Sequence, residues 1–276
     1  MSDREHWKPH RHRADEDDNP TLVLIHGFGA SHRWWNQITP LLAPWRTIRV
    51  DLLGHGSSPR AEAGYSPNEQ AAAIHDLLDA FDIKHAVPVG HSMGFDVAIA
   101  LAERLATTDR IPALIGLDEG PAPEYATLPR GHNIVRSRLL GPLLKAISPN
   151  LAVLQGYRTA FAPDFKLSPA LRSMLIEDYR AQPFESFRGN LEAKTQYAQA
   201  VPLDRRLEQL DLPTLMIFGE RDQLWSSRSS AERYSAIPNV EVRTIPHSGH
   251  TPIIEAPTDS AIAITEFLKC QVSVNN

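Results

Sequence analysis

The chain has almost no cysteine: a single residue, Cys270, occurs among 276. One thiol cannot form an internal disulfide, and this is compatible with a reducing compartment. The sequence also lacks any uninterrupted apolar run of ~18 residues, which a membrane-spanning helix would need. The polar segment 1–19 has no apolar centre of the kind found in secretory signals. We therefore expect a cytoplasmic protein with a flexible tail over residues 1–19 and without stable membrane insertion.

Positive charge is also in short supply, because the net charge is −5 and the isoelectric point is about 6.2. This balance gives no electrostatic case for binding nucleic acid or an anionic membrane. Hydrophobic residues make up 42% and charged residues 22% of the chain, which is ordinary globular usage. We expect a small-molecule substrate as the partner, while the oligomeric state stays open.

Internal repeats are absent, and the pattern of apolar residues divides the chain into three stretches. Residues 20–120 and 206–276 alternate short apolar runs with helical patterns, which predicts βαβ units and a parallel sheet with both faces covered by helices. Residues 121–205 give no strong strand signal and contain helical patterns broken by prolines. The sequence thus predicts one α/β core interrupted by a helical cap, or lid, over residues 121–205.

The segment Gly90-His91-Ser92-Met93-Gly94 fits the pattern G-x-S-x-G. It follows an apolar strand and begins an amphipathic helix, which is the context of a nucleophile elbow. Glycine on both sides allows the tight turn that lifts Ser92 to the start of the helix. We expect Ser92 to be a nucleophile, whereas the alternative is a plain strand–turn–helix junction.

A serine hydroxyl needs a base to accept its proton, and the base needs a carboxylate to hold it. His250, in a loop after a late strand, is the favoured base, with His247 as a rival. Asp222, in the loop after the strand LMIF, is the favoured acid. The alternatives for the acid are Glu220 in the same loop and Asp118 at the end of an earlier strand, each of which could instead serve loop hydrogen bonding or capping.

Two backbone N–H groups are candidates for stabilising a tetrahedral oxyanion. One belongs to Met93 at the start of the helix after Ser92. The other belongs to Phe28 in the segment His26-Gly27-Phe28-Gly29, whose glycines let the backbone turn inward. A plain βα turn is the alternative for this segment.

The order HGFG, DLLGHGSS, GHSMG, FGERD, SGH resembles the α/β-hydrolase superfamily over nearly the whole chain from residue 20. More narrowly, it resembles the capped esterase, lactonase and perhydrolase branch. The resemblance implies a central, mostly parallel, eight-stranded type of sheet flanked by helices, a helical lid, the triad Ser92, Asp222 and His250, and an oxyanion hole at Phe28 and Met93. Nothing in the sequence calls for a metal or an organic cofactor. Phe95 departs from many relatives, which carry glycine there; this departure could narrow the space under Ser92 or change the helix packing.

The residues expected to line a substrate pocket between sheet and lid are His91, Leu224, Trp225 and Phe161, together with Phe28 and Met93. The tryptophans 34, 35 and 45 are expected to pack helices instead. Residues 134–147, IVRSRLLGPLLKAI, mix apolar and basic side chains. They could touch a lipid surface, but the favoured interpretation buries their apolar face against the body of the protein.

These residues favour a serine hydrolase that cleaves a carboxylic ester of a small to medium apolar substrate through an acyl-serine intermediate. Thioester and lactone cleavage use the same groups. Carbon–carbon bond hydrolysis and cofactor-free haloperoxidase or perhydrolase activity are alternatives. A lyase or a ligand-binding receptor on the same fold is the alternative of another class, because function depends on the site and not on the fold.

Overall fold

The computed structural model describes residues 10–12, 19–43, 45–61, 63–127 and 137–271. Its centre is a sheet with the strand order β1-β3-β2-β4-β5-β6-β7, in which only the β1–β3 pair is antiparallel. The expected mostly parallel α/β sheet is therefore confirmed, whereas the described residues give seven strands and the count of eight is not confirmed. The strands are β1 (His10–His12), β2 (Thr21–Ile25), β3 (Thr47–Val50), β4 (Ala86–His91), β5 (Leu114–Leu117), β6 (Thr214–Gly219) and β7 (Val240–Ile245).

The N-terminal segment differs in one place from the flexible tail expected over residues 1–19. Residues His10–His12 form β1, which pairs with β3 at the edge of the sheet. The sequence gives no apolar alternation there, but an open sheet edge offers unpaired backbone groups that any extended segment can bond. The other residues up to 18 lie outside the described part of the chain.

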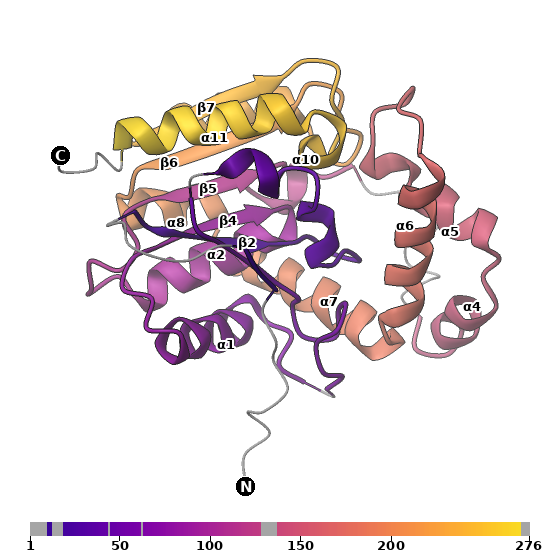
Figure 1. Cartoon of the computed structure of the whole chain (residues 1–276). Helices are drawn as coiled ribbons and strands as arrows, with labels where there is room; N and C mark the ends of the chain where they lie inside the picture. Colours follow the sequence, from indigo (N-terminus) through magenta and orange to yellow (C-terminus); the bar gives the residue numbers. More distant parts are fainter. Residues whose placement is uncertain (1–9, 13–18, 44, 62, 128–136, 272–276) are drawn as a thin grey trace, which may run out of the picture.

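Helices cover both faces of the sheet (Figure 1). Side chains alternate along β2, so Val23 and Ile25 join one buried cluster with α1, α2 and α8, while Leu22 and Leu24 join another with the short turns at 32–42 and α11. The helices are α1 (Pro67–Ala80), α2 (Met93–Arg104), α4 (Gly141–Ile147), α5 (Asn150–Tyr157), α6 (Pro169–Ala181), α7 (Phe184–Ala200), α8 (Leu203–Leu210), α9 (Ser227–Tyr234), α10 (Pro252–Glu255) and α11 (Pro257–Gln271). Short 3-10 turns occupy His32–Trp35, Thr39–Leu42, Pro123–Tyr125 and Arg158–Ala160.

Local sequence explains where α1 begins. Ser66 accepts a hydrogen bond from the backbone N–H of Glu69, and the Glu69 side chain bonds back to the Ser66 backbone. Pro67 takes the first helical position, where its missing N–H has no intrahelical partner to lose. The capping box fixes the start of α1, the element that packs against α2.

The helices α4 to α7 lie within the segment 121–205, which separates β5 from β6 and which we call the insertion. In Figure 1 its helices α4, α5 and α6 stand to one side of the sheet, and the chain then returns through α8 to β6. Several ties join the insertion to the sheet side. Arg33 donates to Asp178 at 2.6 Å and Trp34 donates to the same carboxylate at 2.9 Å. Asn190 accepts from Gln70 at 2.9 Å.

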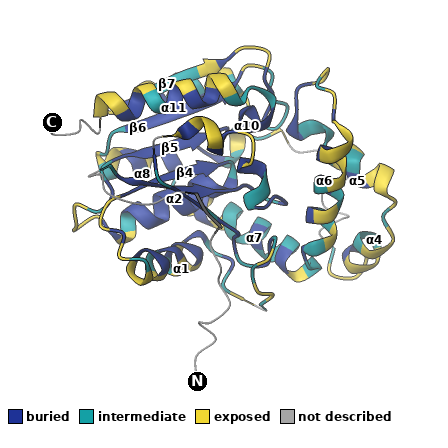
Figure 2. Cartoon of the chain, viewed as in Figure 1, coloured by how far each residue is buried: buried dark blue, intermediate teal, exposed yellow. Residues whose placement is uncertain are grey.

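The interpretation that residues 134–147 bury their apolar face is wrong for the part that the structure describes, residues 137–147. Leu139, Leu140, Leu143 and Ile147 are all exposed (Figure 2). The side of α4 that is turned inward carries Gly141 and the half-buried pair Leu144 and Lys145 instead. The helix α4 spans only seven residues and packs on one side alone. The rest of the protein therefore covers only part of its apolar surface.

A search for membrane-spanning helices among the described residues finds none that combines the length and apolarity needed to cross a bilayer.

Candidate active site

Ser92 lies at the sharp junction between β4 and α2. Its backbone angles, φ 50° and ψ −129°, fall outside the regions that side chains usually allow. A Cβ atom at Gly90 would come within 2.5 Å of the Gly94 backbone, and one at Gly94 would lie 2.2 Å from the carbonyl oxygen of Ile25. Both glycines of the motif are therefore required by close backbone contact, and Ser92 adopts the strained strand-to-helix turn that is expected of a nucleophile elbow.

The departure at Phe95 changes packing below the elbow. Phe95 is fully buried, and a Cβ atom at Gly116 of β5 would lie 2.9 Å from its ring. Glycine at 116 thus makes room for the ring that replaces the usual glycine. The large side chain belongs to the core between α2 and the sheet.

Asp222 and His250 meet at the carboxyl ends of β6 and β7. Oδ2 of Asp222 lies 2.8 Å from Nδ1 of His250. Oδ1 of Asp222 accepts hydrogen bonds from the backbone N–H groups of Leu224, at 2.6 Å, and Trp225, at 3.3 Å. The carboxylate is therefore held on both oxygens, and its side chain has no exposed surface. A proton on Nδ1 of His250 directs the lone pair of the neutral ring to Nε2.

His91, the neighbour of Ser92, connects the elbow with the histidine loop. Its Nε2 lies 2.7 Å from the carbonyl oxygen of His250, and the two rings lie 5.1 Å apart between centroids. Burial, and to a smaller extent the nearby His250, lower the pKa of His91 to about 3. His91 thus stays neutral and donates from Nε2. The contact brings Ser92 and His250 to the same edge of the sheet.

The loop with Phe28 lies against the elbow. A Cβ atom at Gly27 would be 3.0 Å from the Cβ of Ser92, so a side chain there would be crowded. The carbonyl oxygen of Gly29, at φ 69°, accepts a hydrogen bond of 2.6 Å from the hydroxyl of Tyr157 in α5. Met93 occupies the first turn of α2, where backbone N–H groups have no intrahelical acceptor. The two expected oxyanion donors, Phe28 and Met93, therefore flank Ser92 from separate segments.

Asp118 lies beside the Asp222–His250 pair, and one side-chain ligand atom of each of the three residues falls within 4.8 Å of the others. Burial raises the pKa of Asp118 well above its ordinary value, and the adjacent Asp222 carboxylate raises it further. Such a group could in principle hold a metal ion. However, the raised pKa of Asp118 favours its neutral form, and this disfavours metal binding because metal ligands must be deprotonated.

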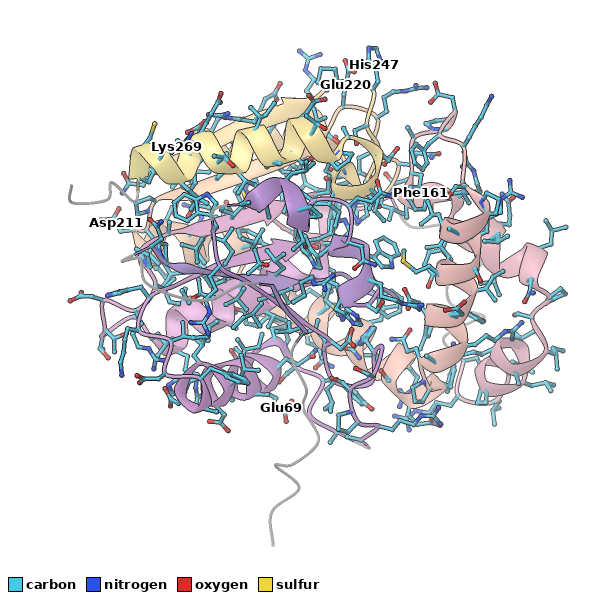
Figure 3. The ribbon with its side chains drawn as sticks, viewed as in Figure 1. Glu69, Phe161, Asp211, Glu220, His247 and Lys269 are labelled. Carbon is cyan, nitrogen blue, oxygen red and sulfur yellow. The ribbon has the colours of Figure 1, made fainter. Side chains whose placement is uncertain are left out.

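The rival site residues lie elsewhere. His247 is exposed and its backbone N–H donates to the side chain of Glu220 at 3.0 Å. Figure 3 shows both side chains at the outer edge of the molecule, away from Phe161. The structure therefore does not bring His247 or Glu220 to Ser92, and Glu220 serves the loop hydrogen bonding that was its alternative role.

The expected pocket residues fall into two groups. Leu224 and Trp225 are half-buried, and Trp225 covers Gly120, where a Cβ atom would lie 2.3 Å from the indole. Phe161 is fully buried and stacks on Trp34 with 6.2 Å between ring centroids, while Trp34 lies 6.0 Å from His91. His91 and Phe161 thus form a packed wall, not an open lining. Trp34, Trp35 and Trp45 are buried as expected, but Trp34 also belongs to this wall.

Sequence reasoning missed Glu255, which holds the histidine loop. Oε1 of Glu255 accepts from the backbone N–H groups of Gly249, at 3.0 Å, and Thr251, at 3.2 Å. Oε2 accepts from the N–H of Ala162 in the insertion at 2.8 Å. Its position five residues after His250, at the end of the short helix α10, was the only available signal.

A second missed group is a buried charge cluster. Lys194 of α7 donates to Glu119 at 2.5 Å and to Asp96 at 3.1 Å, and both carboxyl groups are buried. Burial raises the pKa of Glu119 to about 8, although Lys194 opposes the shift. Glu119 directly follows Asp118, so the cluster joins the insertion to the site edge of the sheet.

Comparison with known proteins agrees with this geometry. A family model described as the alpha/beta hydrolase fold matches residues 20–257. The chain is 28% identical to the "Putative 2-succinyl-6-hydroxy-2,4-cyclohexadiene-1-carboxylate synthase" of Bacillus subtilis, covering 92% of this chain and 93% of the relative. It is 26% identical to "Lipase 3" of a Moraxella species, over 89% and 77% of the two chains. The enol-lactonase structure from Burkholderia xenovorans superposes with a TM-score of 0.79 at 21% identity, over 95% and 96%.

Proposed function

Because this chain belongs to the α/β-hydrolase family, we propose that it is a serine hydrolase that cleaves carboxylic esters, lactones included. The observation that supports this most is the 2.8 Å contact between Asp222 and His250 at the edge of the sheet where Ser92 stands. Similarity to a lipase and to an enol-lactonase supports ester chemistry in general terms. The free thiol of Cys270 is exposed and would stay reduced in the cytoplasm, which is the compartment we propose.

The proposed reaction has two acyl-transfer steps. Nε2 of His250 takes the Ser92 proton while Oγ forms a bond to the ester carbonyl carbon, and the N–H groups of Phe28 and Met93 stabilise the oxyanion. The carbon–oxygen bond to the alcohol then breaks, and the alcohol leaves with the proton from His250. A water molecule repeats the sequence on the acyl-serine, which releases the carboxylic acid and restores Ser92.

We also propose that the insertion acts as a cap over this site. Phe187 of α7 packs on Phe28 with 4.9 Å between ring centroids. Tyr157 of α5 bonds Gly29 next to it, and Gln223, one residue after Asp222, donates to the carbonyl oxygen of Phe161 at 2.7 Å. These contacts support a role for the insertion in enclosing substrate, since a dry site strengthens the oxyanion contacts.

The proposal predicts that a fluorophosphonate probe labels the protein at Ser92. Replacing Ser92 by alanine should abolish labelling and reduce kcat on p-nitrophenyl acetate by about 10⁴-fold or more, because no other hydroxyl stands at the elbow. The measurement is gel fluorescence of the labelled chain together with steady-state kinetics.

A matched control is Ser235→Ala, since Ser235 is exposed after α9 and its hydroxyl donates to the nearby carbonyl oxygen of Glu232. It should label and turn over as the wild type does. Retained labelling in Ser92→Ala would show that the nucleophile is another residue.

A second candidate function is a non-hydrolytic reaction at the same residues. The observation that favours it is the 28% identity to a protein named as a synthase that makes a cyclohexadiene carboxylate. A wild-type protein that binds a fluorophosphonate but hydrolyses no ester, thioester or lactone would favour this candidate.

A further inference from the structure

The outer side of α4 and α5 carries an unusual concentration of exposed apolar side chains. Among the described residues seven large hydrophobic side chains are exposed, and five of them fall between positions 139 and 151. We call these five the apolar patch. They are Leu139 at 89%, Leu140 at 53%, Leu143 at 58%, Ile147 at 64% and Leu151 at 79% exposure. Several exposed apolar side chains gathered in one segment in this way mark an interaction site, whereas single exposed residues are ordinary.

The patch cannot be buried by turning α4 inward, because the other side of this helix is already anchored. Nζ of Lys145 lies 3.6 Å from the centre of the Tyr179 ring and donates to the Tyr179 carbonyl oxygen. In α5 the inward residue is Val153, which is buried. Figure 2 shows the exposed sides of α4 and α5 on the outside of the insertion, remote from the sheet. The patch therefore faces solvent in the folded chain.

The charge of this region is opposite to that of the whole protein. No Asp or Glu occurs between Ala126 and Pro163, although the chain as a whole carries a net charge of −5. The same segment contains five basic residues, namely Arg130, Arg136, Arg138, Lys145 and Arg158. Arg138 is exposed directly before Leu139.

A further basic side chain comes from α6. The exposed guanidinium of Arg180 donates to the carbonyl oxygens of Lys145 and Ser148 at the end of α4. Acidic side chains at the flanks of the segment have partners of their own: Glu177 pairs with Arg33 and Asp164 with Arg221, each at 2.6 Å. Arg138 in the turn before α4, Lys145 within α4 and Arg180 bonded to its end thus place positive charge beside the patch.

We propose that the apolar patch docks the insertion onto a lipid–water interface that carries anionic headgroups. Apolar side chains flanked by arginine are the combination that lies in the headgroup region of a bilayer, with the apolar groups in the acyl boundary and the charges near phosphate. A second copy of this chain fits less well, because pairing two patches would bring the Arg138 and Arg180 groups of both copies together. This docking surface goes beyond the proposed ester hydrolysis and does not depend on it.

The test is co-sedimentation of the full chain with vesicles of ether-linked phosphatidylcholine, with and without ether-linked phosphatidylglycerol. Ether lipids contain no ester bond, so binding is read separately from hydrolysis. The wild type should bind the vesicles that contain phosphatidylglycerol, and raised salt should weaken that binding because it screens the charges. Leu143→Ser combined with Ile147→Ser should weaken it about tenfold or more, since less apolar area enters the interface.

The matched control is Ile262→Ser, which removes a side chain that is 50% exposed on α11, outside the patch. This control should bind as the wild type does, and both variants should keep wild-type turnover of p-nitrophenyl acetate. Failure of the wild type to bind anionic vesicles would overturn the proposal, as would equal binding by the patch variant. Concentration-dependent dimers in light scattering, lost in the patch variant and unaccompanied by vesicle binding, would assign the patch to a second copy instead.

Discussion

At the scale of single residues, the site contains two buried carboxyl groups with different protonation. Asp222 bonds His250 and two backbone N–H groups, which suits an ionised carboxylate. Asp118 accepts one backbone hydrogen bond, from Gly219 at 2.8 Å, and burial beside Asp222 raises its pKa well above the ordinary value, which favours the neutral form. The two groups therefore divide into a charged partner for the imidazole and a neutral neighbour.

This division predicts unequal effects for two isosteric substitutions. Asp222→Asn should reduce kcat/KM on a short ester by about 10³- to 10⁴-fold, because the amide cannot hold the imidazole tautomer or stabilise its positive form. Asp118→Asn should cost less than about tenfold, because asparagine is neutral as the protonated acid is. Steady-state kinetics on both variants make the comparison, and a larger loss for Asp118→Asn would identify Asp118 as the acid.

At the scale of elements, α5 joins the apolar patch to the loop at Phe28. Leu151 lies near the start of this helix, and Tyr157 at its end donates to Gly29. Burial raises the pKa of Tyr157, so its hydroxyl remains a donor. The same loop is braced from α6, because Gln182 bonds His55 at 2.8 Å and His55 accepts weakly from the Gly29 N–H. The insertion thus helps to set the position of an expected oxyanion donor.

Removing the Tyr157 hydroxyl should therefore affect both activity and stability. Tyr157→Phe leaves a buried carbonyl oxygen unpaired, which costs about 1–3 kcal/mol, and should lower kcat/KM roughly tenfold as the loop loosens. Thermal unfolding and ester kinetics measure the two effects. The control is Tyr179→Phe in α6, whose hydroxyl donates to Ser148 at 3.5 Å instead of to the loop at Phe28. Equal activity of both variants would show that α5 does not position the loop at Phe28.

At the scale of the whole molecule, the sequence predicted what depends on local geometry. The glycines around Ser92 and the apolar strands are readable because steric limits and side-chain alternation act over a few residues. The pairing of Asp118 with Asp222 was not readable, since it depends on β5 and β6 being neighbours in the sheet. The room that Gly116 leaves for Phe95 has the same origin.

Whole-chain averages also concealed local features. A net charge of −5 argues against an anionic membrane as a partner, yet residues 126–163 carry only basic charges. An amphipathic pattern in the insertion predicted burial, because such patterns usually face a core. The outcome was different because short helices at the rim of a molecule have solvent on one side and a single packing partner on the other. Net charge and overall composition therefore do not predict a partner; the distribution of charge and apolar surface over the fold is needed as well.

The buried carboxyl group of Glu119 makes the stability of the fold depend on pH. The pKa of Glu119 rises from its ordinary 4.5 to about 8 in the fold, mainly through burial, while Lys194 opposes the shift and Asp96 adds to it. The hydroxyl of Tyr234 is a further titratable group in the field of this carboxyl. Between pH 4.5 and about pH 8, the unfolded chain has released the Glu119 proton that the folded chain keeps. The stability contribution is therefore complete below the unfolded value and is lost as pH rises toward about 8.

Glu119→Gln cannot titrate, so its free energy of unfolding should fall less steeply than that of the wild type from about pH 5 to about pH 8. The difference in slope should approach one proton, or about 1.4 kcal/mol per pH unit. Urea unfolding at several pH values measures it. Glu232→Gln, an exposed residue paired with Arg228, should keep the wild-type slope. Identical slopes for Glu119→Gln and the wild type would mean that Glu119 is ionised throughout, with Lys194 outweighing the effect of burial.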